Sequence, residues 1–265
     1  MGRLTSIHVR RCAVIVVLAT LVGGCSSSSS SGGASTTTQL TVFAASSLTK
    51  AFTQIGQDFH TVFPDVTVTF DFGSSTDLAS QIQSEGTADV FASASDAAMD
   101  TVQSDPGVSD RTKFATNELV IITPPDDPAR IGSIEDLTQP GVKLVLGAEG
   151  VPVGDYARDA LQNAGIEQEA LANVVSNEDD DASVVAKITS GEADAAIVYT
   201  SDVAAVGDTV RSVEIPNDVN VVAIYPIAAV TGSAYPDQAR SFVDYVGGTE
   251  GQDVLKQFGF GPPGG

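Results

Sequence analysis

Two stretches near the start of the chain, VFAASSLTKAF at 42–52 and FDFGSSTDLASQI at 70–82, decide the fold. Each reads as an apolar β-strand that runs directly into a pair of serines and then into an amphipathic helix. A strand end, a hydroxyl and a helix N-terminus at one point form an anion site that needs no cationic side chain. The two stretches therefore predict a protein that grips a small oxyanion between them.

The chain continues this alternation of strands and helices. In the first run we expect strands at 40–45, 66–72 and 89–92 and helices at 47–63, 75–84 and 96–103. In the second run we expect strands at 118–123, 142–146 and 195–198 and helices at 134–137, 155–164, 182–190 and 201–206. An extended segment at 221–230 and helices at 239–246 and 251–258 close the chain. Two such α/β units predict mostly parallel sheets in two lobes, with the ligand in the cleft beyond the strand ends.

The first 25 residues read as a targeting segment. Arg3, Arg10 and Arg11 precede an apolar run at 13–22 that is too short for a membrane-spanning helix. The run ends in LVGGC, which resembles the lipobox of bacterial lipoproteins, so we expect Cys25 to be lipidated. Ordinary secretion with a chance cysteine is the alternative.

The segment that follows Cys25 is rich in serine, glycine and threonine. We expect residues 26–39 to be a flexible linker between the lipid anchor and the folded body. This arrangement places the protein outside the cytoplasm, held at the cell membrane by its lipids.

The charge of the body excludes several classes of partner. Without the three arginines of the signal, 10 basic residues stand against 34 acidic ones, a net charge of −24. Such a chain is unsuited to binding nucleic acid or an anionic membrane surface. A small anion is still compatible, because exposed charges are screened beyond roughly 8 Å. Cys12 leaves with the signal, so the body holds no disulfide and no cysteine metal ligand.

Three further segments place polar groups at helix starts or strand ends. VPVGDYA at 151–157 and NEDDDASVVAKI at 177–188 each open a helix, and AAIVYTSD at 195–202 puts Tyr199 at the end of a strand. The alternative interpretations are a turn, an acidic helix start and a core tyrosine. The serines at 46, 47, 74 and 75 have an alternative too, as ordinary helix caps.

Taken together, these motifs resemble the periplasmic molybdate-binding proteins of bacterial ABC importers over residues 40–260. The motifs that carry the resemblance are VFAASSLT, FGSSTDLASQI, ADVFASAS (88–95), NELVIITP (117–124), VPVGDYA, AAIVYTSD, YPIAAV (225–230) and QFGF (257–260). The resemblance implies the two-lobed type II solute-binding fold. It also implies that hydroxyls and backbone amides hold molybdate or tungstate without any positive charge.

Residue by residue, the resemblance assigns an oxyanion-binding site to Ser47, Ser75, Val153, Asp181 and Tyr199. Val153 and Asp181 are expected to act through their backbone N–H groups. Asp181 stands where the family has an apolar residue, and a carboxylate in an anion site is unfavourable. We therefore expect the Asp181 side chain to turn outward.

The predicted function is a lipid-anchored binding protein, not an enzyme, that delivers molybdate and tungstate to an ABC permease. We expect a monomer without a cofactor or a bound metal ion, with residues 40–118 and 232–265 in lobe 1 and 119–231 in lobe 2. The alternatives are a site for another tetrahedral oxyanion such as sulfate, an amino-acid site that uses Arg130 or Arg158, and, more weakly, a hydrolase. His60 is the body's single histidine and no GxSxG motif is present, so hydrolysis has little support.

Overall fold

The computed structural model describes residues 37–264. The predicted signal segment with Cys25, and the predicted linker up to residue 36, lie outside the described residues. Among residues 37–264 no helix is long and apolar enough to cross a membrane.

The first half of the sheet has the predicted parallel βαβαβ arrangement. Strand β1 pairs with β2 on one side and β3 on the other, both in parallel. The strands span Thr38–Ala45 (β1), Val66–Gly73 (β2) and Val90–Ala92 (β3). The intervening helices are α1 (Thr49–Val62) and α2 (Ser75–Glu85), with α3 (Asp96–Ser104) after β3 and a short 3-10 turn, η1 (Ser46–Leu48), before α1. Each serine pair therefore lies at a strand end, as predicted.

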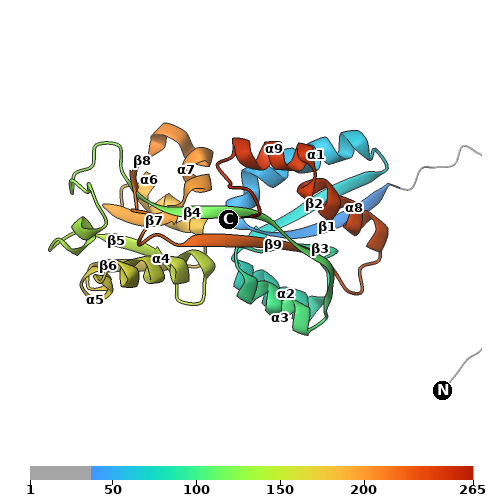
Figure 1. Ribbon diagram of the computed structural model, residues 1–265, viewed down its shortest axis with the longest axis horizontal. Helices are drawn as coiled ribbons and strands as arrows, with labels where there is room; N and C mark the ends of the chain where they lie inside the picture. Colours follow the sequence, from blue (N-terminus) through green and yellow to red (C-terminus); the bar gives the residue numbers. More distant parts are fainter. Residues whose placement is uncertain (1–36, 265) are drawn as a thin grey trace, which may run out of the picture. The chain divides into compact units, whose positions relative to one another are not determined.

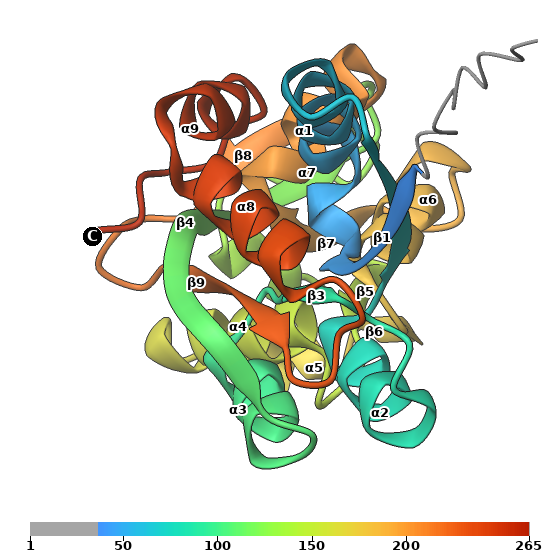
Figure 2. The same ribbon diagram turned by 90° about the vertical axis from the view of Figure 1, so that its right-hand side faces the viewer.

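Helices cover both faces of this half of the sheet. Helix α1 lies on one face with α8 (Pro236–Gly247) and α9 (Thr249–Gln257), whereas α2 and α3 lie on the other (Figure 2). On the first face Phe52 and Phe59 both make edge-on contacts with Phe242. On the second face Leu78 of α2 and Met99 of α3 are buried in one hydrophobic cluster.

Two long antiparallel strands, β4 (Val108–Thr123) and β9 (Val222–Val230), run from this half into the second (Figure 1). Strand β9 pairs with β3, and β4 pairs with β7 (Ala195–Tyr199) and β8 (Arg211–Glu214). Strand β5 (Leu144–Gly147) then pairs in parallel with β7 and β6 (Val174–Glu178). The predicted lobe boundary at 231 falls after β9, although residues 227–229 of β9 already pair with β3.

The helices of the second half also cover both faces of its strands, with α6 and α7 on one side and α4 and α5 on the other (Figure 1). Their bounds are Pro152–Asn163 (α4), Glu167–Leu171 (α5), Asp181–Thr189 (α6) and Thr200–Val206 (α7). Two 3-10 turns complete this half, η2 (Glu135–Thr138) and η3 (Gly207–Thr209). The predicted helix at 134–137 is therefore a 3-10 turn, and β6, β8, α5 and the first ten residues of β4 were not predicted.

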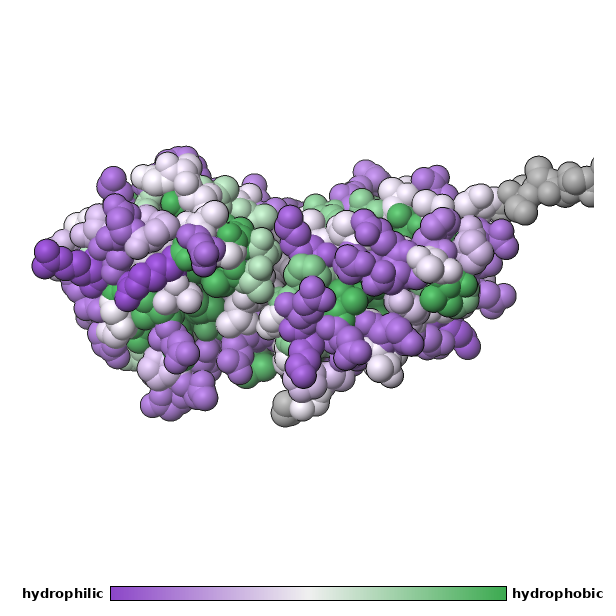
Figure 3. Space-filling view, turned by 90° about the horizontal axis from the view of Figure 1, so that it is seen from above, coloured by the Kyte–Doolittle hydropathy of each residue, from purple (hydrophilic) through white to green (hydrophobic). Residues whose placement is uncertain are grey.

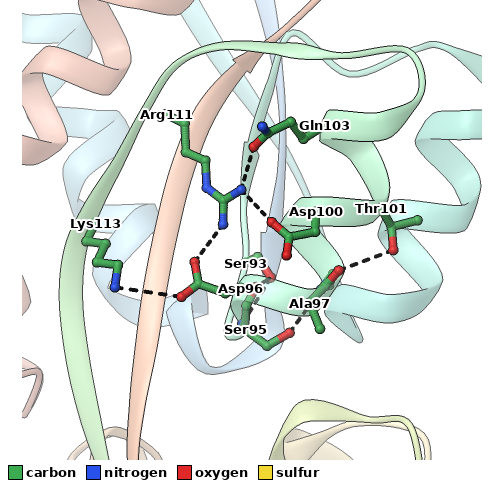
Figure 4. A network of polar contacts seen from close by, with 10 residues as sticks. Ser93, Ser95, Asp96, Ala97, Asp100, Thr101, Gln103, Arg111 and Lys113 are labelled. Atoms are coloured by element: carbon green, nitrogen blue, oxygen red, sulfur yellow. Dashed lines mark hydrogen bonds and ion pairs between the residues drawn. The ribbon is translucent and has the colours of Figure 1, made fainter.

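An ion-pair network fixes the start of β4 against α3 (Figure 4). The Arg111 guanidinium donates to Asp96 and Asp100 at 2.7 and 2.6 Å, and the Lys113 ammonium lies 3.8 Å from Asp96.

Hydrophilic residues cover much of the face shown in Figure 3, with hydrophobic residues in separate patches between them. The mixed α/β fold with helices on both faces is the predicted fold class.

Candidate functional site

The strand ends and helix starts meet at one small cavity. The space not filled by atoms is about 190 Å³, with open solvent at its mouth included. Because this figure includes open solvent, it is an upper limit, and it still lies below the roughly 300–1,000 Å³ of sites for drug-sized ligands. It is lined by Ala45, Ser46, Gly73, Ser74, Ser75, Ala94, Val151, Pro152, Val153, Asp180, Asp181 and Tyr199. Four of the five predicted site residues, all except Ser47, are in this set.

The turn between β2 and α2 presents two hydroxyls to the cavity. Ser74 occupies the N-cap position of α2, yet its side chain makes no capping hydrogen bond. Its Oγ is buried and has no partner among residues 37–264. The Ser75 Oγ accepts a 2.9 Å hydrogen bond from the Ala94 N–H, which leaves the hydroxyl proton available to a ligand. Capping therefore does not explain this serine pair.

The turn between β1 and α1 uses its hydroxyls differently. The Ser46 hydroxyl donates to Oδ1 of Asp181, across the cavity. The Ser47 hydroxyl lies 2.9 Å from the Tyr225 hydroxyl, which in turn lies 3.4 Å from the amide nitrogen of Asn117. The N-cap of the η1 turn is Ala45, so neither serine acts as a side-chain cap there. The direct role predicted for Ser47 stays a prediction.

Tyr199 supplies a third unused donor. The side chain is 1% exposed, and its hydroxyl has no hydrogen-bond partner within the described part of the chain. Burial, followed by the nearby Tyr225 and Asp181, raises the pKa of Tyr199 well above its ordinary value. The phenol therefore keeps its proton and can only be satisfied by an acceptor that enters the cavity.

Val153 lies in the first turn of α4, where backbone N–H groups have no intrahelical acceptor. The next residue must be glycine, because a Cβ on Gly154 would lie 2.2 Å from the carbonyl oxygen of Ala148. Arg158 strengthens this junction by donating to the carbonyl oxygens of Gly147 and Gly154 at 2.9 and 2.8 Å. Its guanidinium is therefore already bonded to backbone carbonyl oxygens. This disfavours the alternative in which Arg158 binds the carboxylate of an amino acid.

The expectation that Asp181 turns outward is wrong. Asp181 begins α6, is 5% exposed and lines the cavity. Oδ1 accepts from Ser46, whereas Oδ2 is buried without a partner in residues 37–264. Burial raises the pKa of Asp181, and the charge of Asp180 acts in the same direction. The acidic run before α6 is therefore not wholly solvated, although Asp180 does cap the helix by accepting from the Ser183 N–H at 2.7 Å.

No lysine or arginine lines the cavity within the described chain. Residues 37–264 also contain no cluster of three histidine, cysteine or acidic side chains that could hold a metal ion. The first turns of α2, α4 and α6 all border the cavity and contribute N–H groups and the positive ends of helix dipoles. The site can therefore stabilise an anion with neutral donors, while Asp181 is an acceptor among them.

Two hydrogen bonds link the halves around the cavity. One is the contact from Ser46 to Asp181, and the other joins the Thr76 hydroxyl to the Gly150 carbonyl oxygen at 2.6 Å. Sequence reasoning missed both, because each partner pair is far apart in the chain. It also missed the unpaired donor of Ser74 in the described chain, whose only signal was its place beside Ser75.

The family model for bacterial extracellular solute-binding proteins matches residues 40–261. The molybdate-binding protein ModA of Mycobacterium tuberculosis is 40% identical over 225 residues, covering 84% of this chain and 85% of its own. Among solved structures, the periplasmic molybdate-binding protein of Azotobacter vinelandii is similar with a TM-score of 0.74 and 18% identity, covering 83% of this chain and 98% of that one.

The sulfate-binding protein SubI of M. tuberculosis matches with the same TM-score, 0.74, at 16% identity, covering 85% of this chain and 87% of that one. Likeness of fold therefore does not separate the two ligands, whereas the 40% identity to ModA extends over nearly the whole body. Fold, site and family match agree, and the chain belongs to the bacterial extracellular solute-binding protein family.

Proposed function

We propose that this protein binds molybdate in the cavity between its two halves and supplies it to an ABC-type permease. The observation that carries the proposal is a set of buried donors without acceptors among residues 37–264, namely the hydroxyls of Ser74, Ser75 and Tyr199, next to three helix starts. A tetrahedral dianion offers an acceptor to each of them. The extensive similarity to ModA supports molybdate as that dianion.

Neutral donors are sufficient for useful affinity. Each charge-assisted hydrogen bond contributes roughly 1.5–3 kcal/mol, and micromolar binding needs about 8 kcal/mol in total. Three hydroxyls together with the N–H groups of Val153 and Asp181 supply enough donors. Because these groups are already held by helices and strands, little ordering is needed when the anion binds.

A panel of molybdate, tungstate, sulfate and phosphate tests this proposal. A ligand that binds only the folded state stabilises it by about 2.7 kcal/mol at a concentration 100 times its Kd. We therefore expect molybdate and tungstate to raise the melting temperature and to give a saturable signal in calorimetry. An unchanged melting curve with millimolar molybdate would contradict the function, and stronger stabilisation by sulfate would favour the alternative ligand.

The phosphate measurement tests whether a carboxylate in the cavity can accept a hydrogen bond from the ligand. A ring made only of donors would reject hydrogen phosphate, which needs an acceptor for its own proton. Asp180 and Asp181 line this cavity, so the ring is not made only of donors. Phosphate binding as tight as molybdate binding would indicate that a carboxylate accepts a hydrogen bond from the P–OH group of the ligand.

The family places the protein outside the cytoplasm. We further propose that it acts as a monomer, that Cys25 carries the lipid anchor, and that the lobes 40–118 with 232–265 and 119–231 close on the anion. A Cys25→Ser variant tests the anchor: it should move from the membrane fraction to the soluble fraction. Retention in the membrane fraction would contradict it.

A further inference from the structure

The site contains a pair of buried acids that the anion-binding role does not explain. Asp181 and Asp202 are 5% and 6% exposed, and both line a second cavity on the far side of Ser46. Each carboxyl group acts on the pKa of the other, so the two lie close together beside this cavity. Asp202 also accepts a 2.9 Å hydrogen bond from the Tyr199 N–H, at the end of β7.

Two buried carboxylates that lie close together cannot both be ionised without a large cost in free energy. Asp181 already accepts from Ser46 through Oδ1, and its Oδ2 has no donor among residues 37–264. A proton on Asp202 would supply the donor that Asp181 lacks. At the same time it would leave the pair with one negative charge instead of two.

The surroundings offer little compensating charge. The titratable or charged groups that neighbour the pair on the elements packed against it are Asp180 on α6, Lys50 on α1, Tyr199 on β7 and Tyr225 on β9. Asp180 adds negative charge, and the two tyrosines are neutral. Lys50 lies at the second cavity, and no salt bridge joins its ammonium to either carboxylate among the described residues.

We propose that Asp202 is a positioning residue that holds a proton shared with Asp181, and that this proton lets the anion site tolerate a carboxylate. The proposal rests on the function proposed above. In the protonated pair, Asp202 donates to Asp181 and accepts from Tyr199, so it links the anion-binding end of α6 to that of β7. When the proton leaves, the pair gains a second negative charge next to the bound dianion.

Burial and the charge of Asp181 raise the pKa of Asp202 well above its ordinary value, and burial raises the pKa of Asp181 as well. Loss of the shared proton therefore falls at higher pH than for an ordinary carboxyl. Affinity for the dianion is expected to weaken as pH rises through this loss, by up to about tenfold in Kd per pH unit.

Calorimetric titration of the wild-type protein with molybdate from about pH 5 to about pH 9 tests this coupling. In Asp202→Asn the amide can still accept from the Tyr199 N–H and donate to Asp181, but it cannot lose a proton. We expect this variant to bind molybdate with a Kd that no longer depends on pH. Asp180→Asn is the matched control, because asparagine also caps helices and the variant removes one nearby charge. It should keep the wild-type slope, shifted to lower pH, because the charge of Asp180 helps to raise the pKa of both acids.

A second measurement needs no ligand. A folded-state pKa that is raised means that the folded protein binds more protons than the unfolded chain. Its stabilising effect is fully present below the ordinary aspartate pKa near 3.9 and is lost as pH rises through the folded-state value. The melting temperature of anion-free wild type should therefore fall with pH relative to that of Asp202→Asn.

The outcomes separate the two proposals. A wild-type Kd that is independent of pH, or a slope that persists in Asp202→Asn, would overturn the shared proton. Parallel melting profiles for the two proteins would overturn it as well. If wild type bound no molybdate at any pH, the proposed function would fail, and diverging melting profiles would still support the proton.

Discussion

The two serine turns share a pair of serines between a strand and a helix, but their chemistry differs. In the turn between β1 and α1, both hydroxyls are occupied, Ser46 by Asp181 and Ser47 by Tyr225. In the turn between β2 and α2, Ser74 has no partner within the described chain and Ser75 keeps a free proton. A strand followed by two serines therefore defines where hydroxyls are placed, but their neighbours decide whether they can serve a ligand.

The difference arises from the elements opposite each turn. The first turn faces Asp181 on α6 and Tyr225 on β9, and both can accept a hydrogen bond. The second turn faces the N–H of Ala94, which can only donate. Removing a hydroxyl whose proton is free should therefore weaken binding more than removing one whose proton is already used.

The largest effect on binding is expected for Ser75→Ala. The variant removes a hydroxyl that lines the cavity and leaves one oxygen of the bound dianion without its donor. We expect a loss of roughly 1.5–3 kcal/mol in molybdate binding, measured by calorimetry. Ser80→Ala, further along the same helix with an exposed hydroxyl, is the control and should bind like wild type. Equal affinity of Ser75→Ala and wild type would contradict the role of the Ser75 hydroxyl as a donor to the anion.

Tyr199→Phe should have the next largest effect on binding. Unlike its effect on binding, its effect on the stability of the anion-free protein should not be unfavourable. Binding should weaken by about 1–2 kcal/mol, whereas the anion-free protein should be no less stable, because a buried hydroxyl without a partner is removed. Tyr225→Phe is the matched variant. Its hydroxyl pairs with Ser47, so it should lower the melting temperature more than Tyr199→Phe does. The reverse order of melting temperatures would argue against the assigned hydrogen bonds.

A smaller loss of about 1 kcal/mol in binding is expected for Ser74→Ala. Since Ser74 makes no capping hydrogen bond, α2 should lose little stability when the hydroxyl is removed. A drop in melting temperature of the size usual for a lost N-cap would show that the hydroxyl caps the helix in solution. Chemical denaturation without molybdate measures that contribution.

The smallest effect on binding, below about 1 kcal/mol, is expected for Ser47→Ala. In this structure the hydroxyl supports Tyr225 and does not line the cavity. The family resemblance predicts a direct role instead. A loss as large as that of Ser75→Ala would therefore mean that Ser47 leaves Tyr225 and turns toward the anion when it binds.

Sequence periodicity was sufficient to predict the bounds of the helices and strands that have one strongly apolar face. The helix that contains Phe52 and Phe59 and the strands around it lie close to their predicted bounds. The start of β4 was missed because VSDRTKFATN is largely polar, and its strand structure depends on pairing with β9. Strands β6 and β8 were missed because they are short and are defined mainly by their neighbours.

For the site as well, features that depend on the local sequence could be predicted, and features that depend on distant neighbours could not. Ser75, Val153 and Tyr199 could be placed because each stands at a strand end or helix start that the local sequence reveals. The orientation of Asp181 could not, because it depends on Ser46 and Asp202, which reach it only through the tertiary fold. A residue's position was therefore predictable, whereas its hydrogen-bond partners were not.

The shared strands β4 and β9 have a mechanical consequence. Because one antiparallel ladder extends through both halves, neither half is joined to the other by a loose tether. Any relative rotation of the halves must therefore twist or bend these two strands. The same two strands also supply pairing partners to each half. If the chain were cut between the halves, we expect that neither half would fold by itself.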